Sequence, residues 1–220
     1  MRKQELTTKY TMIAMFSAIA FVVMSIGRVP MMSIPGLTLK YDPKDIVIII
    51  CGFIYGPLSS AIVSVMVSLL EMFTVSDNGM IGMLMNIISS CFFACTAALI
   101  YKYKRKLSGA VIGLIIGCIF TSFVMVLWNY LITPIYLNIP TAAITPYLFT
   151  FFLPFNLIKG SINAAATMII YKPVSKLMLT AFHIPVSENA KTVNNKNRFI
   201  VIGIAVAVIA MCIGIVFLLK

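Results

Sequence analysis

Long runs of apolar residues, separated by short polar or proline-containing stretches, dominate the sequence. Most of these runs approach the ~17–25 residues that an α-helix needs to cross a bilayer. Only 10% of the 220 residues are charged and 61% are hydrophobic, whereas soluble domains carry roughly 25% charged residues. The pattern predicts an all-α, polytopic membrane protein surrounded by the lipid bilayer. The seven apolar segments are 10–27, 46–56, 57–74, 80–101, 109–132, 147–171 and 199–219.

The positions of the basic residues predict the orientation of these segments. The N-terminus is basic, and so is the stretch 102–106. If residues 46–74 crossed the membrane once, these two basic regions would lie on opposite sides, against the positive-inside rule. A turn at Gly56-Pro57 divides 46–74 into two spans and places both regions in the cytoplasm. We therefore expect a multi-pass protein of the cell membrane with a cytoplasmic N-terminus.

The chain is expected to have three parts: a membrane domain at 1–180, a polar cytoplasmic linker at 181–198 and an additional transmembrane helix at 199–220. If that last helix spans, the C-terminus lies outside. The outer stretch 28–45 carries charges of both signs, which offer partners to one another, so we expect it to fold over the outer face. The outer stretch 133–146 contains three prolines, which favours an extended cap.

The sequence offers few groups for catalysis. The one histidine, His183, falls in the linker, and no P-loop sequence is present. Cys91 and Cys95 lie one helical turn apart without a histidine or carboxylate nearby, so they are interpreted as small buried side chains and not as metal ligands. The basic residues lie between apolar segments and form no single patch. We expect no enzyme activity, catalytic residue, cofactor or metal site, and no binding of nucleic acid.

Lys159 lies near the middle of the sixth apolar segment, where a lysine costs ~2.5–3.5 kcal/mol on insertion scales. Asn156 and Asn163 share its helix face. These residues predict a polar stripe that faces the interior of the bundle, and an ionisable residue there indicates a functional site. The alternative is a structural lysine paired with a helix-end carbonyl or with Glu71, near the outer end of the third segment.

Asn129 lies between two aromatic residues, Trp128 and Tyr130, near the outer end of the fifth segment. Its amide could bind the edge of a heteroaromatic ligand, whereas the aromatics alone are also typical of an interfacial belt. In the first segment, Ala14 and Ala18 form a small-xxx-small pattern that allows close approach of another helix. This pattern is common in membrane helices, so by itself it is weak evidence for a partner.

Four strings in the sequence resemble the substrate-binding S components of energy-coupling factor (ECF) vitamin transporters. Tyr-Asp-Pro-Lys-Asp at 41–45 and Gly-Phe-Ile-Tyr-Gly-Pro at 52–57 resemble the start of these proteins. Asn-Tyr at 129–130 and Pro-Phe-Asn-Leu-Ile-Lys-Gly at 154–160 resemble the riboflavin-specific branch. The similarity extends over roughly residues 8–180, and the additional helix at 199–219 is a departure from the family pattern.

This resemblance implies a six-helix core with a pocket near the outer face, capped by the first outer loop. It implies a partnership with a transmembrane coupling subunit and two cytosolic ATPase subunits, towards which Ala14 and Ala18 would face. Riboflavin is the expected ligand; another vitamin, a precursor or a scaffold role without a ligand are the alternatives. The expected substrate-binding residues are Asn129, Lys159, Asn163, Asn156, Tyr41 and Glu71.

Overall fold

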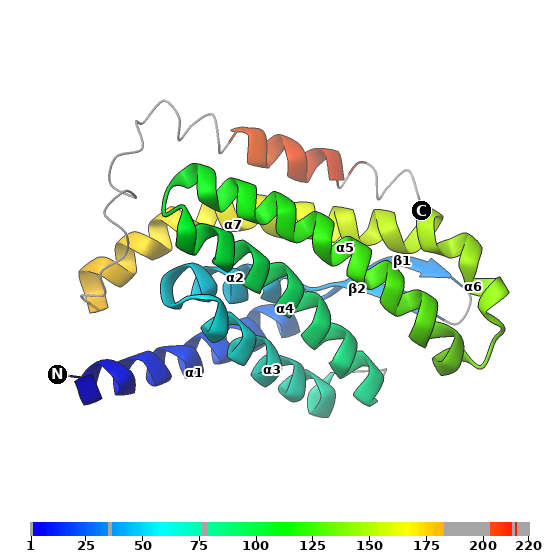
Figure 1. Ribbon diagram of the computed structural model, residues 1–220, viewed down its shortest axis with the longest axis horizontal. Helices are drawn as coiled ribbons and strands as arrows, with labels where there is room; N and C mark the ends of the chain where they lie inside the picture. The colour runs from blue at the N-terminus through cyan, green and yellow to red at the C-terminus, as the bar shows by residue number, and fades with distance from the viewer. Residues whose placement is uncertain (1, 35–36, 76–78, 183–202, 213, 215–220) are drawn as a thin grey trace.

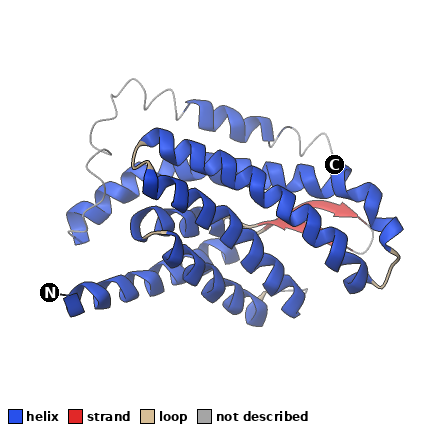
Figure 2. Cartoon of the chain, in the orientation of Figure 1, coloured by secondary structure: helices blue, strands red, loops and turns tan. Residues whose placement is uncertain are grey.

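Helices make up nearly all of the described chain, and one small antiparallel sheet connects the first two (Figures 1 and 2). The computed structural model describes residues 2–34, 37–75, 79–182, 203–212 and 214. The elements are α1 (Arg2–Gly27), β1 (Val29–Ile34), β2 (Leu37–Tyr41), α2 (Lys44–Tyr55), α3 (Pro57–Thr74), α4 (Gly79–Tyr103), α5 (Leu107–Leu137), α6 (Thr141–Tyr147), the π-helix η1 (Leu148–Phe152) and α7 (Leu153–Phe182), followed by a short helix at Gly203–Cys212.

Five helical stretches are long and apolar enough to cross a membrane, which confirms the predicted all-α polytopic bundle. The helix α2 completes the expected six-helix core, but its 12 residues span only ~18 Å. Nine of those residues are buried, so α2 is an internal helix surrounded by α1, α3, α4 and α7. The spanning stretches are Leu6–Gly27, Pro57–Thr74, Gly79–Tyr103, Leu107–Leu137 and Thr141–Tyr171.

The predicted turn between α2 and α3 lies where the sequence placed it. Gly56 has a φ of 93° and a ψ of 171°, a conformation that is open essentially to glycine alone. Pro57 then begins α3, where its missing N–H costs no helical hydrogen bond. The two helices therefore reverse direction within one residue and pack against each other.

Glycines allow the closest helix–helix contacts. A Cβ atom added at Gly113 of α5 would lie 2.7 Å from the carbonyl oxygen of Ala97 in α4. One added at Gly160 of α7 would collide with Sγ of Cys118 in α5. These approaches bring α4, α5 and α7 together along a shared seam, and the candidate site described below lies at its end.

The strands β1 and β2 form a hairpin at one end of the bundle, together with α6 and the last turns of α5 (Figure 1). We call this the hairpin end. The N-terminus and the turns between α2 and α3 and between α4 and α5 lie at the other end, which we call the N-terminal end (Figure 1). The charged loop 28–45 thus folds into a defined cap, in line with the sequence analysis.

The expectation of an extended cap at 133–146 is wrong. The helix α5 continues to Leu137, Asn138 ends it in a left-handed conformation with a φ of 53°, and α6 begins directly after Pro140. Pro140 lies at the N-cap of α6, where N–H groups have no helical partner, whereas Pro134 lies inside the last turn of α5 and Pro146 inside α6. Pro146 precedes the wider turns of η1, and Thr150 Oγ1 donates a hydrogen bond of 2.7 Å to its carbonyl oxygen.

The last apolar segments also differ from their predicted bounds. Helix α7 does not end at residue 171 but continues through Phe182, with Pro173 inside it. Residues 183–198 of the predicted linker, including His183, lie outside the described residues. Of the predicted seventh span, the structure describes the apolar helix Gly203–Cys212.

Candidate ligand-binding site

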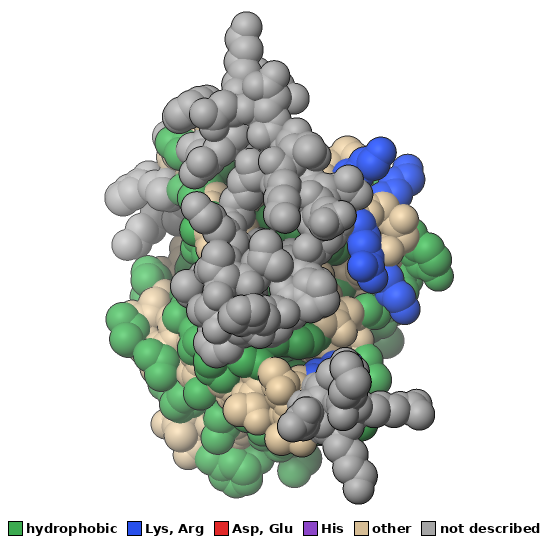
Figure 3. Space-filling view, turned by 90° about the vertical axis from the view of Figure 1, so that its left-hand side faces the viewer, with side chains coloured by type: hydrophobic (Ala, Val, Ile, Leu, Met, Phe, Trp, Pro, Cys, Tyr) green, Lys and Arg blue, Asp and Glu red, His purple; other side chains and the backbone are tan. Residues whose placement is uncertain are grey.

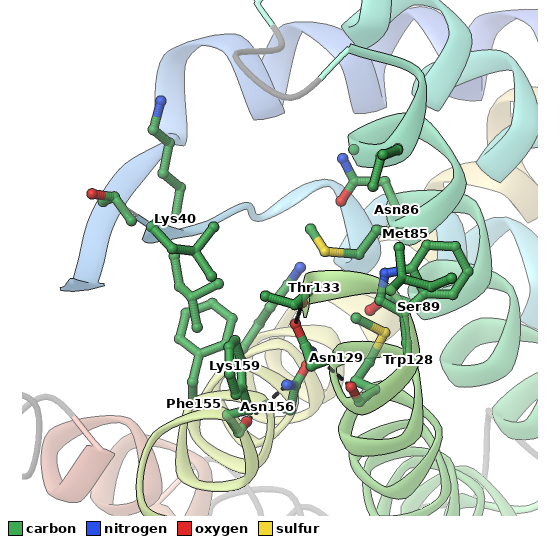
Figure 4. A pocket seen from close by; sticks show the side chains of 18 of the residues that line it. Lys40, Met85, Asn86, Ser89, Trp128, Asn129, Thr133, Phe155, Asn156 and Lys159 are labelled. Carbon is green, nitrogen blue, oxygen red and sulfur yellow. Dashed lines mark hydrogen bonds between the residues drawn. The ribbon is translucent and has the colours of Figure 1, made fainter. Parts of the chain in front are cut away.

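A cavity of about 270 Å³ opens between the hairpin, α4, α5 and α7. This volume is close to the lower end of the ~300–1,000 Å³ typical of small-molecule sites. Side chains from α4, α5 and α7 point into the same space, and Lys40 of β2 lies at its edge (Figure 4). The lining includes Met85, Asn86 and Ser89 of α4, Met125, Trp128, Asn129 and Thr133 of α5, and Phe155, Asn156 and Lys159 of α7.

Lys159 points from α7 towards this cavity and is largely buried, with 8% of its surface exposed. Its Nζ lies 3.5 Å from Oδ2 of Asp42 and 3.7 Å from Oδ2 of Asp45. The two carboxylates offset the cost of placing this ammonium group inside the bundle. The alternative pairing with Glu71 is wrong, because Glu71 contacts two other cations, Arg28 and Lys44.

Lys159 belongs to a larger set of buried charges, which we call the six-charge network. Nη2 of Arg28 lies 2.8 Å from Oε1 of Glu71, and Oε2 of Glu71 contacts Nζ of Lys44. Asp42 lies within 3.4–3.6 Å of all three cations. Three cations therefore face three carboxylates, and the network carries no net charge. Its members are Arg28, Lys44, Lys159, Asp42, Asp45 and Glu71.

Neutral side chains form hydrogen bonds with the network and with one another. Tyr41 Oη donates a hydrogen bond of 2.7 Å to Oδ1 of Asn163, and Nδ2 of Asn163 donates one of 3.2 Å to Oδ2 of Asp45. Ser90 Oγ donates to Oδ1 of Asp45 at 2.5 Å. Tyr41, Asn163 and Glu71 are not among the described residues that line the cavity. They are placed to position Lys159 and its carboxylates. Of the six predicted substrate-binding residues, only Asn129, Asn156 and Lys159 are therefore expected to contact a ligand directly.

Electrostatics on the hairpin side agree with this arrangement. Burial opposes ionisation of Asp42, but Lys44, Lys159 and Arg28 outweigh it and hold the pKa of that carboxyl below its ordinary value. Burial, together with the nearby carboxylates of Asp45 and Asp42, raises the pKa of the Tyr41 hydroxyl. Tyr41 therefore stays protonated and remains a hydrogen-bond donor.

Asn129 and Asn156 supply amide groups at the cavity wall (Figure 4). Nδ2 of Asn129 donates to the carbonyl oxygen of Met125 at 2.6 Å, and its Oδ1 accepts a hydrogen bond from Thr133 at 2.9 Å. Nδ2 of Asn156 donates to the carbonyl oxygen of Phe152 at 2.8 Å. Each amide has two N–H groups and an oxygen with two lone pairs. Both side chains are thus oriented by their own helix and keep capacity for a ligand.

The remaining wall is apolar and aromatic. Trp128 and Phe155 line the cavity from α5 and α7, and Met85 and Met125 add polarisable thioethers. Tyr130 has 42% of its surface exposed and does not line it. The two aromatic residues that flank Asn129 therefore have different orientations. Trp128 faces the cavity, and Tyr130 faces outward, as expected of a residue in a lipid-facing aromatic belt.

Sequence reasoning did not place Asp42, Lys44 and Asp45 among the site residues, although it noted the mixed charges of their loop. A signal was available. A lysine at the middle of an apolar segment needs a carboxylate partner, and two of the protein's six acidic residues occur together at positions 42 and 45, where α2 begins.

Ala14 and Ala18 lie on the exposed face of α1, whereas Ser17 and Ala20 on the opposite face are buried. The small-residue face is thus not used for packing within the described part of the chain. It forms a smooth strip of surface where a second helix backbone could approach closely.

Comparisons with known proteins give one consistent picture. The family described as "ECF transporter, substrate-specific component" matches residues 8–171, a range that contains every residue lining the cavity. The riboflavin transporter RibU of Staphylococcus aureus (strain TCH60) is 30% identical over 173 residues, which cover 76% of this chain and 89% of that protein. The riboflavin transporter FmnP of Bacillus subtilis (strain 168) is 30% identical over 174 residues, or 74% of this chain and 90% of FmnP.

The fold is also similar to that of a solved protein. A structure described as "Structure and mechanism of the S component of a bacterial ECF transporter" matches with a TM-score of 0.67 and 28% identity. The match covers 79% of this chain and 98% of the other. Sequence and fold therefore agree over the region that builds the cavity.

Proposed function

The chain belongs to the family of ECF transporter substrate-specific components, and from this premise we propose that its cavity binds riboflavin for import. The observation that carries the proposal is the composition of the cavity wall. Trp128 and Phe155 offer flat apolar surfaces, while Asn129 and Asn156 offer donors and acceptors beside them. Riboflavin has the matching parts: a flat ring system, a polar edge with both donors and acceptors, and a polyhydroxyl tail.

The charge of the site favours riboflavin over charged vitamins. The ammonium group of Lys159 lies in the cavity wall, yet the carboxylates of Asp42 and Asp45 already balance it. The six-charge network sums to zero, so a carboxylate-bearing vitamin would find no uncompensated cation there, and a cationic vitamin no uncompensated anion. Riboflavin is uncharged at neutral pH and requires neither. The riboflavin transporters named above, at 30% identity, support the same ligand.

A titration of the purified protein with riboflavin tests this proposal. Trp128 is the single tryptophan of the chain and lines the cavity, so bound flavin should quench its emission. We expect saturable quenching of tryptophan and flavin fluorescence at one riboflavin per protein. Asn129→Ala should weaken binding about tenfold, the equivalent of one hydrogen bond of ~1.4 kcal/mol.

Tyr130→Ala is the matched control, because Tyr130 is the next residue of α5 but lies outside the cavity lining. It should leave the affinity unchanged. If the two variants bind riboflavin equally well, Asn129 is not a ligand contact. If riboflavin does not bind but another vitamin raises the unfolding temperature, the protein is a vitamin-binding subunit with a different ligand. If no vitamin binds, a scaffold role without a ligand is favoured.

The sequence contains no P-loop, so this chain cannot itself power transport through one, and the family of substrate-specific components implies separate energising subunits. We therefore include in the proposal a transmembrane coupling subunit and two cytosolic ATPase subunits, with the exposed strip at Ala14 and Ala18 as the docking face. The double substitution Ala14→Leu and Ala18→Leu should abolish uptake and leave riboflavin binding intact. Survival of both uptake and binding would exclude this face as the docking surface.

A further inference from the structure

One face of the additional helix is buried. Ala205 and Cys212 of the helix Gly203–Cys212 have 5% and 7% of their surface exposed, and Val208 and Ile209 on the same side are half-buried. The opposite side consists of small, exposed residues: Gly203, Ala207, Ala210 and Gly214. A helix surrounded by lipid would be exposed on every side, so the buried face packs against another part of the chain.

This face lies against α5 and α7. Figure 1 shows the helix running beside these elements, on the side of the bundle away from α1. The thiol of Cys212 is within electrostatic range of the thiol of Cys118 in α5. Cys118 is buried, and its Sγ donates a hydrogen bond of 3.7 Å to the carbonyl oxygen of Leu157 in α7. The helix therefore covers the place where α5 meets α7 at Cys118, which we call the α5–α7 contact.

The α5–α7 contact lies at membrane depth. Cys118 is ~17 Å from the start of α5. Figure 3, which views the N-terminal end, shows lysine and arginine side chains gathered there, and the hairpin closes the other end of the bundle (Figure 1). Lipid is therefore the surrounding medium at the height of Cys118, unless another helix displaces it.

Buried charges lie directly behind this contact. A recess of about 10 Å³ is lined by Asp45 and Lys159 of the six-charge network and also by Cys118 and Gly160 of the α5–α7 contact. Gly160 has no side chain, and a Cβ atom added to it would collide with Sγ of Cys118. At this point small groups therefore separate the ion pair of Lys159 and Asp45 from the outer side of α5 and α7.

Ionisable groups in a membrane protein are costly next to lipid, whereas small side chains allow a further helix to approach closely. From the one-sided burial of the additional helix, the position of Cys212 beside Cys118 and the recess behind it, we propose that this helix seals the six-charge network from lipid. It docks on the α5–α7 contact and replaces lipid there with protein. This surface is on the side opposite α1, so the strip at Ala14 and Ala18 stays free for a partner subunit.

The native cysteines report whether the helix covers the contact. Ala205→Phe places a large side chain in the buried face, and Ala207→Phe places the same side chain on the exposed face of the same helix. Each purified protein is treated with N-ethylmaleimide in detergent without ligand, and peptide mass spectrometry follows the labelling of each cysteine. We expect Cys118 in Ala205→Phe to be labelled at least about tenfold faster than in the wild type or in Ala207→Phe, because the displaced helix exposes its thiol.

Two other cysteines distinguish local opening from unfolding. Cys51 of α2 is fully buried and should stay unlabelled in all three proteins. Cys91 of α4 is half-buried and should react at the same rate in all three. Faster labelling of Cys51 together with Cys118 would indicate general destabilisation and would count against a local seal. Equal labelling of Cys118 in the wild type and both variants would overturn the proposal.

A second measurement tests whether the helix shields charge. In thermal unfolding without ligand, Ala205→Phe should lower the unfolding temperature of the wild type more than that of Lys159→Met with Asp45→Asn, because the latter protein has no ion pair behind the contact. Ala207→Phe should lower neither. An equal fall in the two backgrounds would show that the helix only packs against the bundle, and its role as a seal would be excluded.

Discussion

The loss of stability caused by removing the charge of Lys159 should be relieved by neutralising Asp45 and not by neutralising Asp42. Lys159→Met removes one cation and leaves one negative charge in excess inside the bundle. Asp42 would keep Arg28 at 3.4 Å and Lys44 at 3.6 Å. Asp45, by contrast, has no other ion-pair partner among the described residues, and only the neutral Ser90 and Asn163 would remain hydrogen-bonded to it.

The magnitude follows from the cost of an uncompensated buried charge. Breaking a buried ion pair costs ~3–5 kcal/mol. At ~2–4 °C per kcal/mol for a protein of this size, 3 kcal/mol corresponds to a fall in the unfolding temperature of ~6–12 °C. Asp45→Asn added to Lys159→Met neutralises the stranded carboxylate and should restore about half of that loss or more. Asp42→Asn added to the same variant should restore little or nothing, because it leaves Arg28 and Lys44 with one carboxylate fewer.

Thermal unfolding without ligand, followed by the emission of Trp128, measures the wild type, the Lys159 variant and the two double variants under one condition. Equal rescue by Asp42→Asn and Asp45→Asn would refute the assignment of separate roles to the two carboxylates. An unfolding temperature unchanged by Lys159→Met would refute the network itself as a source of stability.

Three further predictions concern packing, backbone and pH. Gly113→Ala should destabilise the protein by ~1–3 kcal/mol, because the new methyl group meets the backbone of α4, whereas Gly203→Ala, in open space, should be neutral or slightly stabilising in thermal unfolding. Gly56→Ala should cost ~1–3 kcal/mol although nothing lies within 4 Å of the added atom, because the cost is in the backbone angles; an unchanged unfolding temperature would contradict this. The pKa of Asp42 is lower in the folded protein than its ordinary value of ~4, so ionised Asp42 stabilises the fold at pH values above ~4. This stabilisation should be lost as the pH falls below ~4. The pH profile of the unfolding temperature of Asp42→Asn should lack this loss.

The sequence was sufficient to predict the helical elements of this fold and one of its turns. Segment length and hydrophobicity identify membrane helices because lipid imposes a strong and uniform constraint. The reversal at Gly56-Pro57 was predicted because both residues have restricted roles and the charge pattern required a turn. The conformation of 133–146 was not predictable from its three prolines, because only Pro140 interrupts the helical structure, whereas Pro134 and Pro146 lie inside α5 and α6.

The candidate site was predictable in part. Lys159 and Asn129 could be identified because polar groups are rare at such depths in a membrane protein. The partner of Lys159 could not, because the sequence does not say which carboxylate a folded loop brings to it: Glu71 and Asp45 were equally available. The division between cavity contacts and supporting residues, such as Asn163, depends on side-chain direction, which only the packed bundle determines.

The short length of α2 has a consequence for the electric field across the membrane. A helix of ~18 Å cannot bridge a hydrocarbon layer of ~30 Å. Asp42, two residues before α2, lines the cavity of the candidate site, and Tyr55 at the other end of α2 lines a second recess at the N-terminal end of the bundle. If water fills both recesses, most of the transmembrane voltage falls across the layer of protein that contains α2. A lone ion at its edge would experience a force that changes with the voltage. The six-charge network contains equal numbers of opposite charges, so the net force on it is close to zero, and occupancy of the cavity beside it should not depend on the membrane potential.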